Sequence, residues 1–131
     1  MKFLLDTHIA IWALTDRARI KPQVPEIIAN TDNAIFVSVV AIWEIAIKTP
    51  LNRERGKPPF SATEGIGYFR EAGFTLLDIP PRHAAAVESL PLLHRDPFDR
   101  LLVAQALSEP MRLVTADALV ARYSDTIILA A

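Results

Sequence analysis

Residues 34–48 read Ala-Ile-Phe-Val-Ser-Val-Val-Ala-Ile-Trp-Glu-Ile-Ala-Ile-Lys, a short apolar run followed at once by a longer apolar segment. Residues 34–37 are typical of a buried strand, and Ser38 after them is of a residue type that caps helices. Residues 39–48 place apolar side chains on most of the surface of a helix, which Pro50 is expected to end. The stretch therefore predicts a strand that runs directly into a buried helix.

The same alternation continues on both sides of this stretch. The helix predicted after Ser61 begins with a capping box completed by Glu64 and ends at Gly73. Because the strands are apolar on both faces, we expect a three-layer α/β/α sandwich with a central parallel sheet of four to five strands. Further strands are predicted at residues 2–5, 74–79, 111–115 and 126–129, and helices at 7–14, 26–30, 62–72, 82–90, 97–108 and 117–123.

The composition is that of a globular domain without disulfides. The chain has 131 residues, of which 51% are hydrophobic and none is cysteine, so thiol catalysis and cysteine-type zinc sites are excluded. The first apolar stretch stops at Asp6, too short for a secretion signal, and no stretch reaches the ~20 apolar residues of a membrane span. We expect a single soluble domain, residues 1–131, in the cytoplasm.

The charge balance argues against broad binding to duplex nucleic acid. Lysine and arginine number 14 against 15 acidic residues, a formal net charge of −1, whereas nucleic-acid binders usually carry a basic excess. Residues 51–59 are predicted to form a loop, and basic residues gather there and just before it. These basic residues are Lys48, Arg53, Arg55 and Lys57. They form either a basic rim beside a functional site or a solvated loop.

Five acidic residues fall where a parallel sheet gathers functional groups, at the carboxyl ends of its strands. Asp6 directly follows the first predicted strand, and Asp117 closely follows the strand at residues 111–115. Asp96 and Asp99 share one face at the start of a helix, and Glu44 interrupts the apolar helix of residues 39–48. Crowded carboxylates raise each other's pKa unless a hard cation is present. The set predicts a site for Mg²⁺ or Mn²⁺.

Each acid taken singly also has a structural explanation. Asp6, Asp96 and Asp117 stand at helix starts and are suited to capping them. Asp99 stands at the third position of a possible capping box, and Glu44 precedes Lys48 by four residues, the spacing of a helical ion pair. The metal site is favoured by the combination of acids and by none of them alone.

The hydroxyl-bearing and aromatic residues give weaker signals. Thr7, Ser38 and Thr115 stand at strand ends beside the acids, where they can orient carboxylates or cap helices. Trp12 and Trp43 are expected in the core rather than on a base-stacking surface. His8, His83 and His94 have no metal-ligand spacing among themselves. His94 could reach the site because it stands two residues from Asp96, but an ordinary polar loop residue is the favoured interpretation.

Four segments carry a family resemblance in their order along the chain. They are Leu-Leu-Asp-Thr-His at 4–8, Ser-Val-Val-Ala-Ile-Trp-Glu-Ile-Ala-Ile-Lys at 38–48, His-Arg-Asp-Pro-Phe-Asp-Arg-Leu-Leu-Val-Ala-Gln-Ala at 94–106 and Leu-Val-Thr-Ala-Asp at 113–117. Together they resemble the PIN-domain family, in particular the VapC-type toxins of bacterial toxin–antitoxin pairs. The resemblance spans nearly the whole chain, and Asp-Pro-Phe-Asp-Arg is its most specific part.

The resemblance implies a parallel α/β/α sandwich and an endoribonuclease that depends on Mg²⁺ or Mn²⁺. It further implies an RNA substrate, a homodimer and a cognate antitoxin that holds the toxin inactive. The family's catalytic and metal-binding acids fall on Asp6, Glu44, Asp99 and Asp117. We assign accessory positions to Asp96, Thr7 and Thr115.

The residues predict hydrolysis by water rather than attack by a side chain. There is no cysteine, no recognisable Ser/His/Asp arrangement and no pair of histidines with a spacing suited to activating the RNA 2′-hydroxyl. A metal held by Asp6 and Asp99, with Asp117, would lower the pKa of a water and clamp the phosphate. Glu44 would bind a second metal or orient the water.

Two related folds are excluded by single positions. A phosphatase of the haloacid dehalogenase type needs an aspartate two residues after the first one, where this chain has His8, and a receiver domain needs a lysine after the last strand, where it has alanines. A DNA-directed or structure-specific PIN-like nuclease remains an alternative, because it would use the same metal chemistry. A non-catalytic PIN-like interaction domain is the second alternative, although such a domain would be expected to have lost acids of the site.

Overall fold

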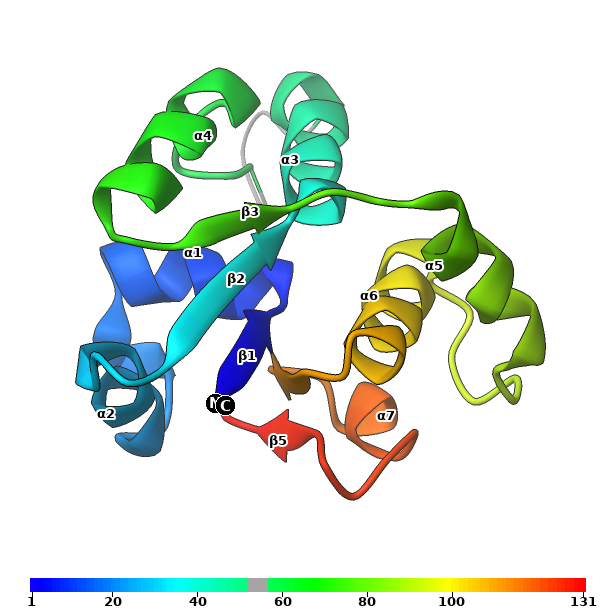
Figure 1. Ribbon diagram of the computed structural model, residues 1–131. Coiled ribbons are helices and arrows are strands. Elements are labelled where there is room, and N and C mark those ends of the chain that lie inside the picture. The colour runs from blue at the N-terminus through cyan, green and yellow to red at the C-terminus, as the bar shows by residue number, and fades with distance from the viewer. Residues whose placement is uncertain (52–56) are drawn as a thin grey trace.

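The centre of the computed structural model, which describes residues 1–51 and 57–131, is a five-stranded sheet in the order β3-β2-β1-β4-β5 (Figure 1). Every neighbouring pair of strands is parallel. This confirms the predicted parallel sheet. The strands are β1 (Lys2–Leu5), β2 (Ala34–Ser38), β3 (Thr75–Leu77), β4 (Arg112–Thr115) and β5 (Ile128–Leu129).

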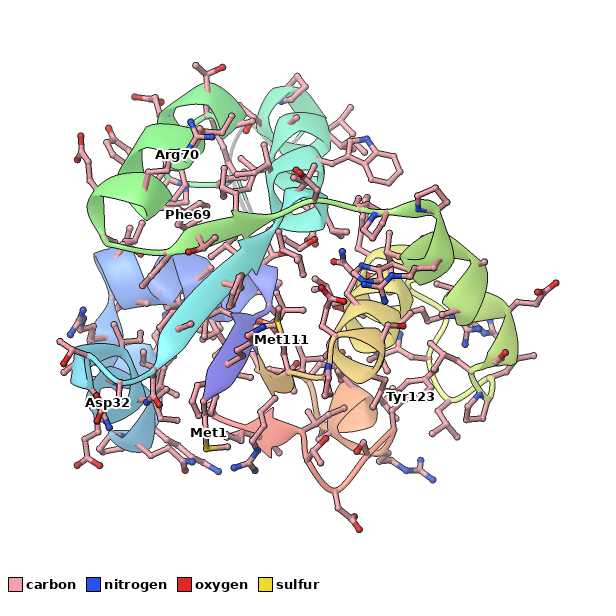
Figure 2. All side chains as sticks on the ribbon, in the orientation of Figure 1. Met1, Asp32, Phe69, Arg70, Met111 and Tyr123 are labelled. Carbon is pink, nitrogen blue, oxygen red and sulfur yellow. The ribbon has the colours of Figure 1, made fainter. Side chains whose placement is uncertain are left out.

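Helices cover both faces of the sheet, which confirms the three-layer sandwich. The side chains of β1 alternate between faces: Phe3 and Leu5 lie in one buried cluster with residues of α1, α2 and α4, and Leu4 lies in a second with residues of α6 and α7. Phe69, labelled in Figure 2, is fully buried in the first cluster. The helices are α1 (Thr7–Thr15), α2 (Gln23–Ala29), α3 (Val39–Leu51), α4 (Ala62–Glu71), α5 (Pro81–Ala86), α6 (Pro97–Ser108) and α7 (Ala118–Ala121), with short 3₁₀ turns η1 (Arg17–Arg19) and η2 (Val87–Ser89).

Several predicted helix ends are confirmed. Ser61 and Glu64 form the capping box of α4, and Gly73 after this helix has a φ of +85°, a conformation that favours glycine. Asp96 caps α6, whose first residue is Pro97. Within the described residues, no helix is long and apolar enough to cross a membrane.

Other predicted ends are wrong. Helix α3 continues through Pro50 to Leu51. In this last turn a proline removes only one hydrogen bond, to the carbonyl of the exposed Ala46, so the helix continues past it. The helix predicted at residues 82–90 is divided into α5 and η2, and β3 and β5 are shorter than expected. In the predicted loop at 51–59, Leu51 belongs to α3 and residues 52–56 lie outside the described part of the chain.

A buried polar network ties the start of α3 to α5 and α6. The hydroxyl of Ser38 donates to Oε1 of Gln105 at 2.5 Å and accepts from the backbone N–H of Val40 at 3.0 Å. Nε2 of Gln105 donates to the carbonyl of Asp78 and lies 3.1 Å from Nδ1 of His83. The side chains of Ser38, Gln105 and His83 are fully buried, so the network fixes how α3, which carries Glu44, sits against α6, which carries Asp99.

Candidate active site

The predicted acids line one cleft at the carboxyl edge of the sheet. Asp6 follows β1 and Asp117 follows the neighbouring strand β4, so the two enter the cleft from adjacent strands. Glu44 reaches it from α3, and Asp96 and Asp99 from the start of α6. The cleft has a volume of about 490 Å³ and is lined by Asp6, Thr7, His8, Trp12, Glu44, Lys48, His94, Asp96, Asp99, Ala116, Asp117 and Ala118.

Asp6 is buried and held by three hydrogen bonds. One carboxylate oxygen accepts from the backbone N–H of Ile9 at 2.8 Å, which caps α1. The other accepts from the hydroxyl of Thr115 at 2.7 Å and from the backbone N–H of Ala116 at 2.9 Å. Burial raises the pKa of Asp6, and these hydrogen bonds oppose that rise. Thr115 is buried and does not line the cleft, and its hydrogen bond fixes the orientation of Asp6.

Glu44 is also buried, with a side chain only 6% exposed. The hydroxyl of Thr7 donates to one of its carboxylate oxygens at 2.9 Å, and the ammonium group of Lys48 donates to the other at 2.6 Å. The predicted helical ion pair and the predicted place at the cleft are therefore both present. Lys48 compensates one negative charge of the acid cluster, and this pairing makes the burial of Glu44 tolerable.

Asp96 and Asp99 differ in their surroundings, although they are neighbours. Asp96 accepts from the backbone N–H groups of Phe98 at 2.8 Å and Asp99 at 3.4 Å, as a helix cap does. The carboxylate of Asp99 accepts no hydrogen bond from the described residues, and burial together with the charges of Asp96 and Asp6 raises its pKa to about 7. The possible capping box is absent, because the backbone N–H of Asp96 donates to His94 Nδ1 instead of to Asp99.

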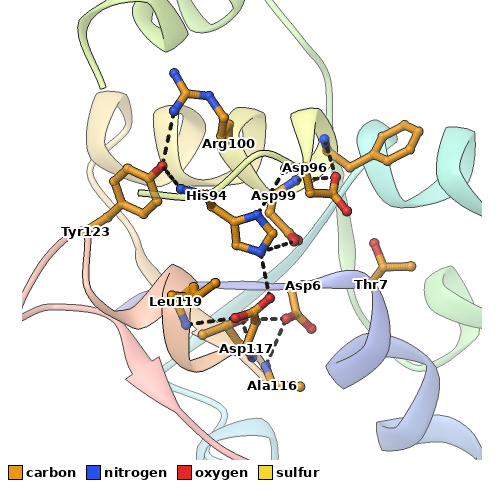
Figure 3. Close-up of polar contacts among 12 residues, drawn as sticks. Asp6, Thr7, His94, Asp96, Asp99, Arg100, Ala116, Asp117, Leu119 and Tyr123 are labelled. Atoms are coloured by element: carbon orange, nitrogen blue, oxygen red, sulfur yellow. Dashed lines mark hydrogen bonds and ion pairs between the residues drawn. The ribbon is translucent and has the colours of Figure 1, made fainter. Parts of the chain in front are cut away.

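His94 belongs to the site, so its expected place as an ordinary polar loop residue is wrong. Its Nε2 lies 2.7 Å from a carboxylate oxygen of Asp117 and 3.4 Å from one of Asp99 (Figure 3). The hydrogen bond to Asp117 raises the pKa of His94. Burial would raise the pKa of Asp117, but the hydrogen bonds from His94 and from the backbone of Leu119 lower it overall.

The loop before α6 is fastened so that His94 faces the acids. The hydroxyl of Tyr123 accepts from the backbone N–H of His94 at 3.0 Å and from the guanidinium of Arg100 at 3.1 Å. Arg100 also donates to the carbonyls of Pro91 and Val87. In sequence, the only trace of this arrangement is a histidine two residues before a helix cap, because Tyr123 comes from a distant segment.

Of the two tryptophans predicted in the core, Trp43 lies outside it and Trp12 packs against it. Trp43 is 54% exposed on the outer side of α3 and meets the ring of Phe98 edge-on, with 5.1 Å between ring centroids. Trp12 is half-buried against the core and also lines the cleft. The guanidinium of Arg19 lies 5.3 Å from the centroid of the Trp12 ring. Of the basic run, Lys48 and Lys57 are described, and Arg53 and Arg55 lie outside the described residues.

The donor set suits a hard divalent cation. His94, Asp99 and Asp117 each offer one atom, and these atoms lie within 4.8 Å of one another. Asp6 and Glu44 line the same cleft, and the charge of each raises the pKa of Asp99. A carboxylate that lies among like charges and accepts no hydrogen bond from the described residues is what a bound cation would stabilise, and carboxylate oxygen is the ligand that Mg²⁺ and Mn²⁺ prefer.

Comparison with known proteins identifies a family and a fold. The family model described as PIN domain matches residues 3–125. Among curated proteins no relative matches the sequence. A solved structure of VapBC2 from Rickettsia felis, bound to a DNA fragment from the promoter, is similar with a TM-score of 0.68 and 18% identity, over 98% of this chain and 96% of that chain.

Two further structures show the same likeness. DNA-bound VapBC from Salmonella typhimurium gives a TM-score of 0.66 at 16% identity, over 98% of this chain and 96% of that chain. FitAcB from Neisseria gonorrhoeae gives 0.59 at 17% identity, over 96% of this chain and 95% of that chain. At these identities the structures establish a shared fold.

Proposed function

Because the chain belongs to the PIN domain family, we propose that it is a metal-dependent endoribonuclease and the toxin of a toxin–antitoxin pair. The family indicates a nuclease, a hydrolase of phosphodiester bonds. The observation that carries the proposal is the single cleft lined by Asp6, Glu44, Asp99 and Asp117. An interaction domain without catalysis would have no reason to keep four carboxylates crowded together at a cost in stability. We propose that residues 1–131 act as one domain.

We assign the cation to Asp6, Asp99 and Asp117, with Glu44 as a further ligand or as the group that orients the attacking water. When bound, such a cation lowers the pKa of a water and offsets the charge of the phosphate. Thr115 and Thr7 are accessory residues that orient Asp6 and Glu44. RNA as the substrate rests on the resemblance of the sequence motifs to VapC-type toxins.

The raised pKa of Asp99 makes the effect of the metal depend on pH. Without a cation, folded Asp99 keeps its proton up to about pH 7, whereas the unfolded chain loses it near 3.8, so its ionisation lowers stability as the pH rises through this window. A cation reverses this penalty. We expect Mn²⁺ to raise the melting temperature more at about pH 8 than at about pH 6, because protons compete for the same oxygens.

Thermal melts with Mn²⁺ and with EDTA at the two pH values measure this effect. Asp99→Asn is the matched variant: without metal it should melt higher than the unmodified chain at the higher pH, and it should lose most of the Mn²⁺ shift. A melting temperature that Mn²⁺ leaves unchanged at both pH values would exclude the metal site.

The toxin role predicts an effect on cells. We expect expression of the chain alone to stop growth, because cleavage of cellular RNA blocks protein synthesis, and expression together with its cognate antitoxin to restore growth. Colony counts after induction measure both arms, with Asp99→Asn as the harmless control. If the unmodified chain and this variant allow equal growth, the toxin role is wrong.

A stripe of exposed apolar side chains supports the proposed homodimer. Trp43, Ile47 and Leu51 follow one another at intervals of four residues on α3 and are 54%, 37% and 72% exposed. Side chains at this spacing share one face of a helix, and contiguous exposed apolar surface marks an interaction site. We propose that this face meets the same face of a second copy.

A charge on this face should separate the two copies. We expect Ile47→Glu to convert a dimer into a monomer, because two glutamates would meet across a symmetric apolar interface. Light scattering after size-exclusion chromatography gives the mass. Leu107→Glu is the control, since Leu107 is 46% exposed on α6 and is not part of the stripe on α3. An unchanged mass for Ile47→Glu, or an unmodified chain that is already monomeric, contradicts the proposed interface.

A further inference from the structure

A second hollow adjoins the acid cleft, on the side of α1 and η1. Its volume is about 420 Å³, within the range of small-molecule sites. The two cavities share Thr7, His8, Trp12, Glu44 and Lys48, so they are continuous. We call this second cavity the Trp12 pocket. An RNA strand held at the acids would therefore have beside it a recess that is lined mainly by residues without a catalytic role.

The walls of the Trp12 pocket combine flat π surfaces with apolar side chains. Trp12 is flanked by the ring of His8, with 5.5 Å between centroids and an interplanar angle of 41°, and by the guanidinium of Arg19. Ile11 and Ile45 add buried aliphatic surface. Indole, imidazole and guanidinium planes are the groups on which unpaired nucleobases stack in proteins.

The charges at the pocket suit a nucleotide rather than an uncharged apolar ligand. Arg19, Lys48 and Lys57 contribute three cations to its lining, against the two carboxylates of Asp16 and Glu44. Arg19 is exposed and pairs with Asp16 at 3.4 Å, a surface contact that costs little to exchange for a phosphate. The adjoining acid cleft lacks such a surplus of positive charge. The Trp12 pocket therefore suits a different part of a nucleotide from the acid cleft.

We propose that the Trp12 pocket binds the base of an unpaired nucleotide next to the scissile phosphate, with the base stacked on the exposed guanidinium of Arg19, which lies over the Trp12 ring. This inference rests on the proposed ribonuclease function and adds a specificity-determining subsite to it. In a duplex the bases are stacked and paired in the interior, so only a nucleotide that is splayed out of a single strand or loop can enter a recess. The pocket therefore selects single-stranded RNA.

The fluorescence of Trp12 tests this directly. The chain has two tryptophans, so Trp43→Phe leaves Trp12 as the only one. We expect single-stranded oligo(A) or oligo(U) RNA, added in EDTA so that it remains intact, to quench the emission of this variant, and a blunt RNA duplex not to do so. In the same background Arg19→Ala should weaken binding about ten-fold, within the range for loss of a stacking partner.

Arg17→Ala is the matched control. Arg17 lies on the same 3₁₀ turn and is exposed, but it does not line the pocket, so its loss removes the same charge and no stacking surface. We expect Arg17→Ala to bind within about two-fold of its parent. In cleavage assays with Mn²⁺, Arg19→Ala should raise KM and leave kcat nearly unchanged, because a subsite supplies binding that is already present in the ground state.

Equal quenching of Trp12 by duplex and by single-stranded RNA would overturn the pocket, and so would equal weakening of RNA binding by Arg19→Ala and Arg17→Ala. A KM of Arg19→Ala equal to that of the unmodified chain would also overturn it. The fourth contradicting result is quenching by the antitoxin but not by RNA. Failure of the ribonuclease proposal looks different. Quenching by single strands without cleavage in Mn²⁺ would retain the base pocket and reject the nuclease, whereas cleavage without quenching would reject the pocket alone.

Discussion

Replacing Asp99 by asparagine is expected to reduce RNA cleavage by on the order of a thousand-fold, because loss of a metal-binding carboxylate removes several kcal/mol of transition-state stabilisation. Burial and the charges of Asp96 and Asp6 raise the pKa of Asp99 to about 7, and its carboxylate makes no helix-capping contact. The stability of the fold should not fall in the same variant, since the substitution removes a repelled charge.

Asp96→Asn is the matched control, three residues away on the same helix turn. Asp96 accepts hydrogen bonds from the backbone of Phe98 and Asp99, and asparagine caps helices about as well as aspartate. We therefore expect this variant to keep its melting temperature and most of its activity. Initial cleavage rates with a labelled RNA compare the two. An inactive Asp96→Asn beside an active Asp99→Asn would reverse the two roles.

The order of the layers could be predicted from sequence because it depends on local patterns. The run at 34–37 followed by Ser38 and an apolar helix fixes a parallel strand–helix unit, and the strong caps at Ser61 and Asp96 fix the starts of α4 and α6. The helix and strand ends that differ from the prediction depend on tertiary contacts. Pro50 lies within α3 because the bond it removes is at an exposed turn, which the sequence pattern does not show.

The acids of the candidate site could be predicted for a similar reason, since the carboxyl ends of parallel strands meet at one edge. The side chains around the acids could not. His94 faces Asp117 only because Tyr123, from a segment after β4, holds its backbone in place. The exposure of Trp43 was missed because α3 is apolar on nearly all sides, so the sequence does not show which side the core covers.

The contacts in the cleft bear on which group attacks the phosphorus. Sequence spacing showed no pair of histidines for 2′-hydroxyl attack, yet His8 and His94 both line the cleft. Both ring nitrogens of His94 are already engaged, Nδ1 by the backbone N–H of Asp96 and Nε2 by Asp117. The hydroxyls of Thr7 and Thr115 donate to carboxylates, so neither is a free nucleophile. These contacts favour water as the attacking group in the reaction that we propose.

Chelation of the metal should therefore abolish cleavage, with a loss on the order of a thousand-fold or more in EDTA that Mn²⁺ restores. In the reaction that we propose, the oxygen of water forms a bond to phosphorus and the bond from phosphorus to the 3′-oxygen breaks. The 3′-oxygen takes up a proton. Each cut then leaves a 3′-hydroxyl and a 5′-phosphate, whereas attack by the 2′-hydroxyl would leave a 2′,3′-cyclic phosphate and a 5′-hydroxyl.

Mass spectrometry of the fragments of a defined single-stranded RNA, cut with Mn²⁺ and incubated in parallel with EDTA, tests the metal-dependent nuclease most directly. We predict 5′-phosphate and 3′-hydroxyl ends in Mn²⁺, intact RNA in EDTA, and intact RNA with Asp99→Asn under both conditions. Fragments that end in a 2′,3′-cyclic phosphate, or equal cleavage in EDTA, would contradict it.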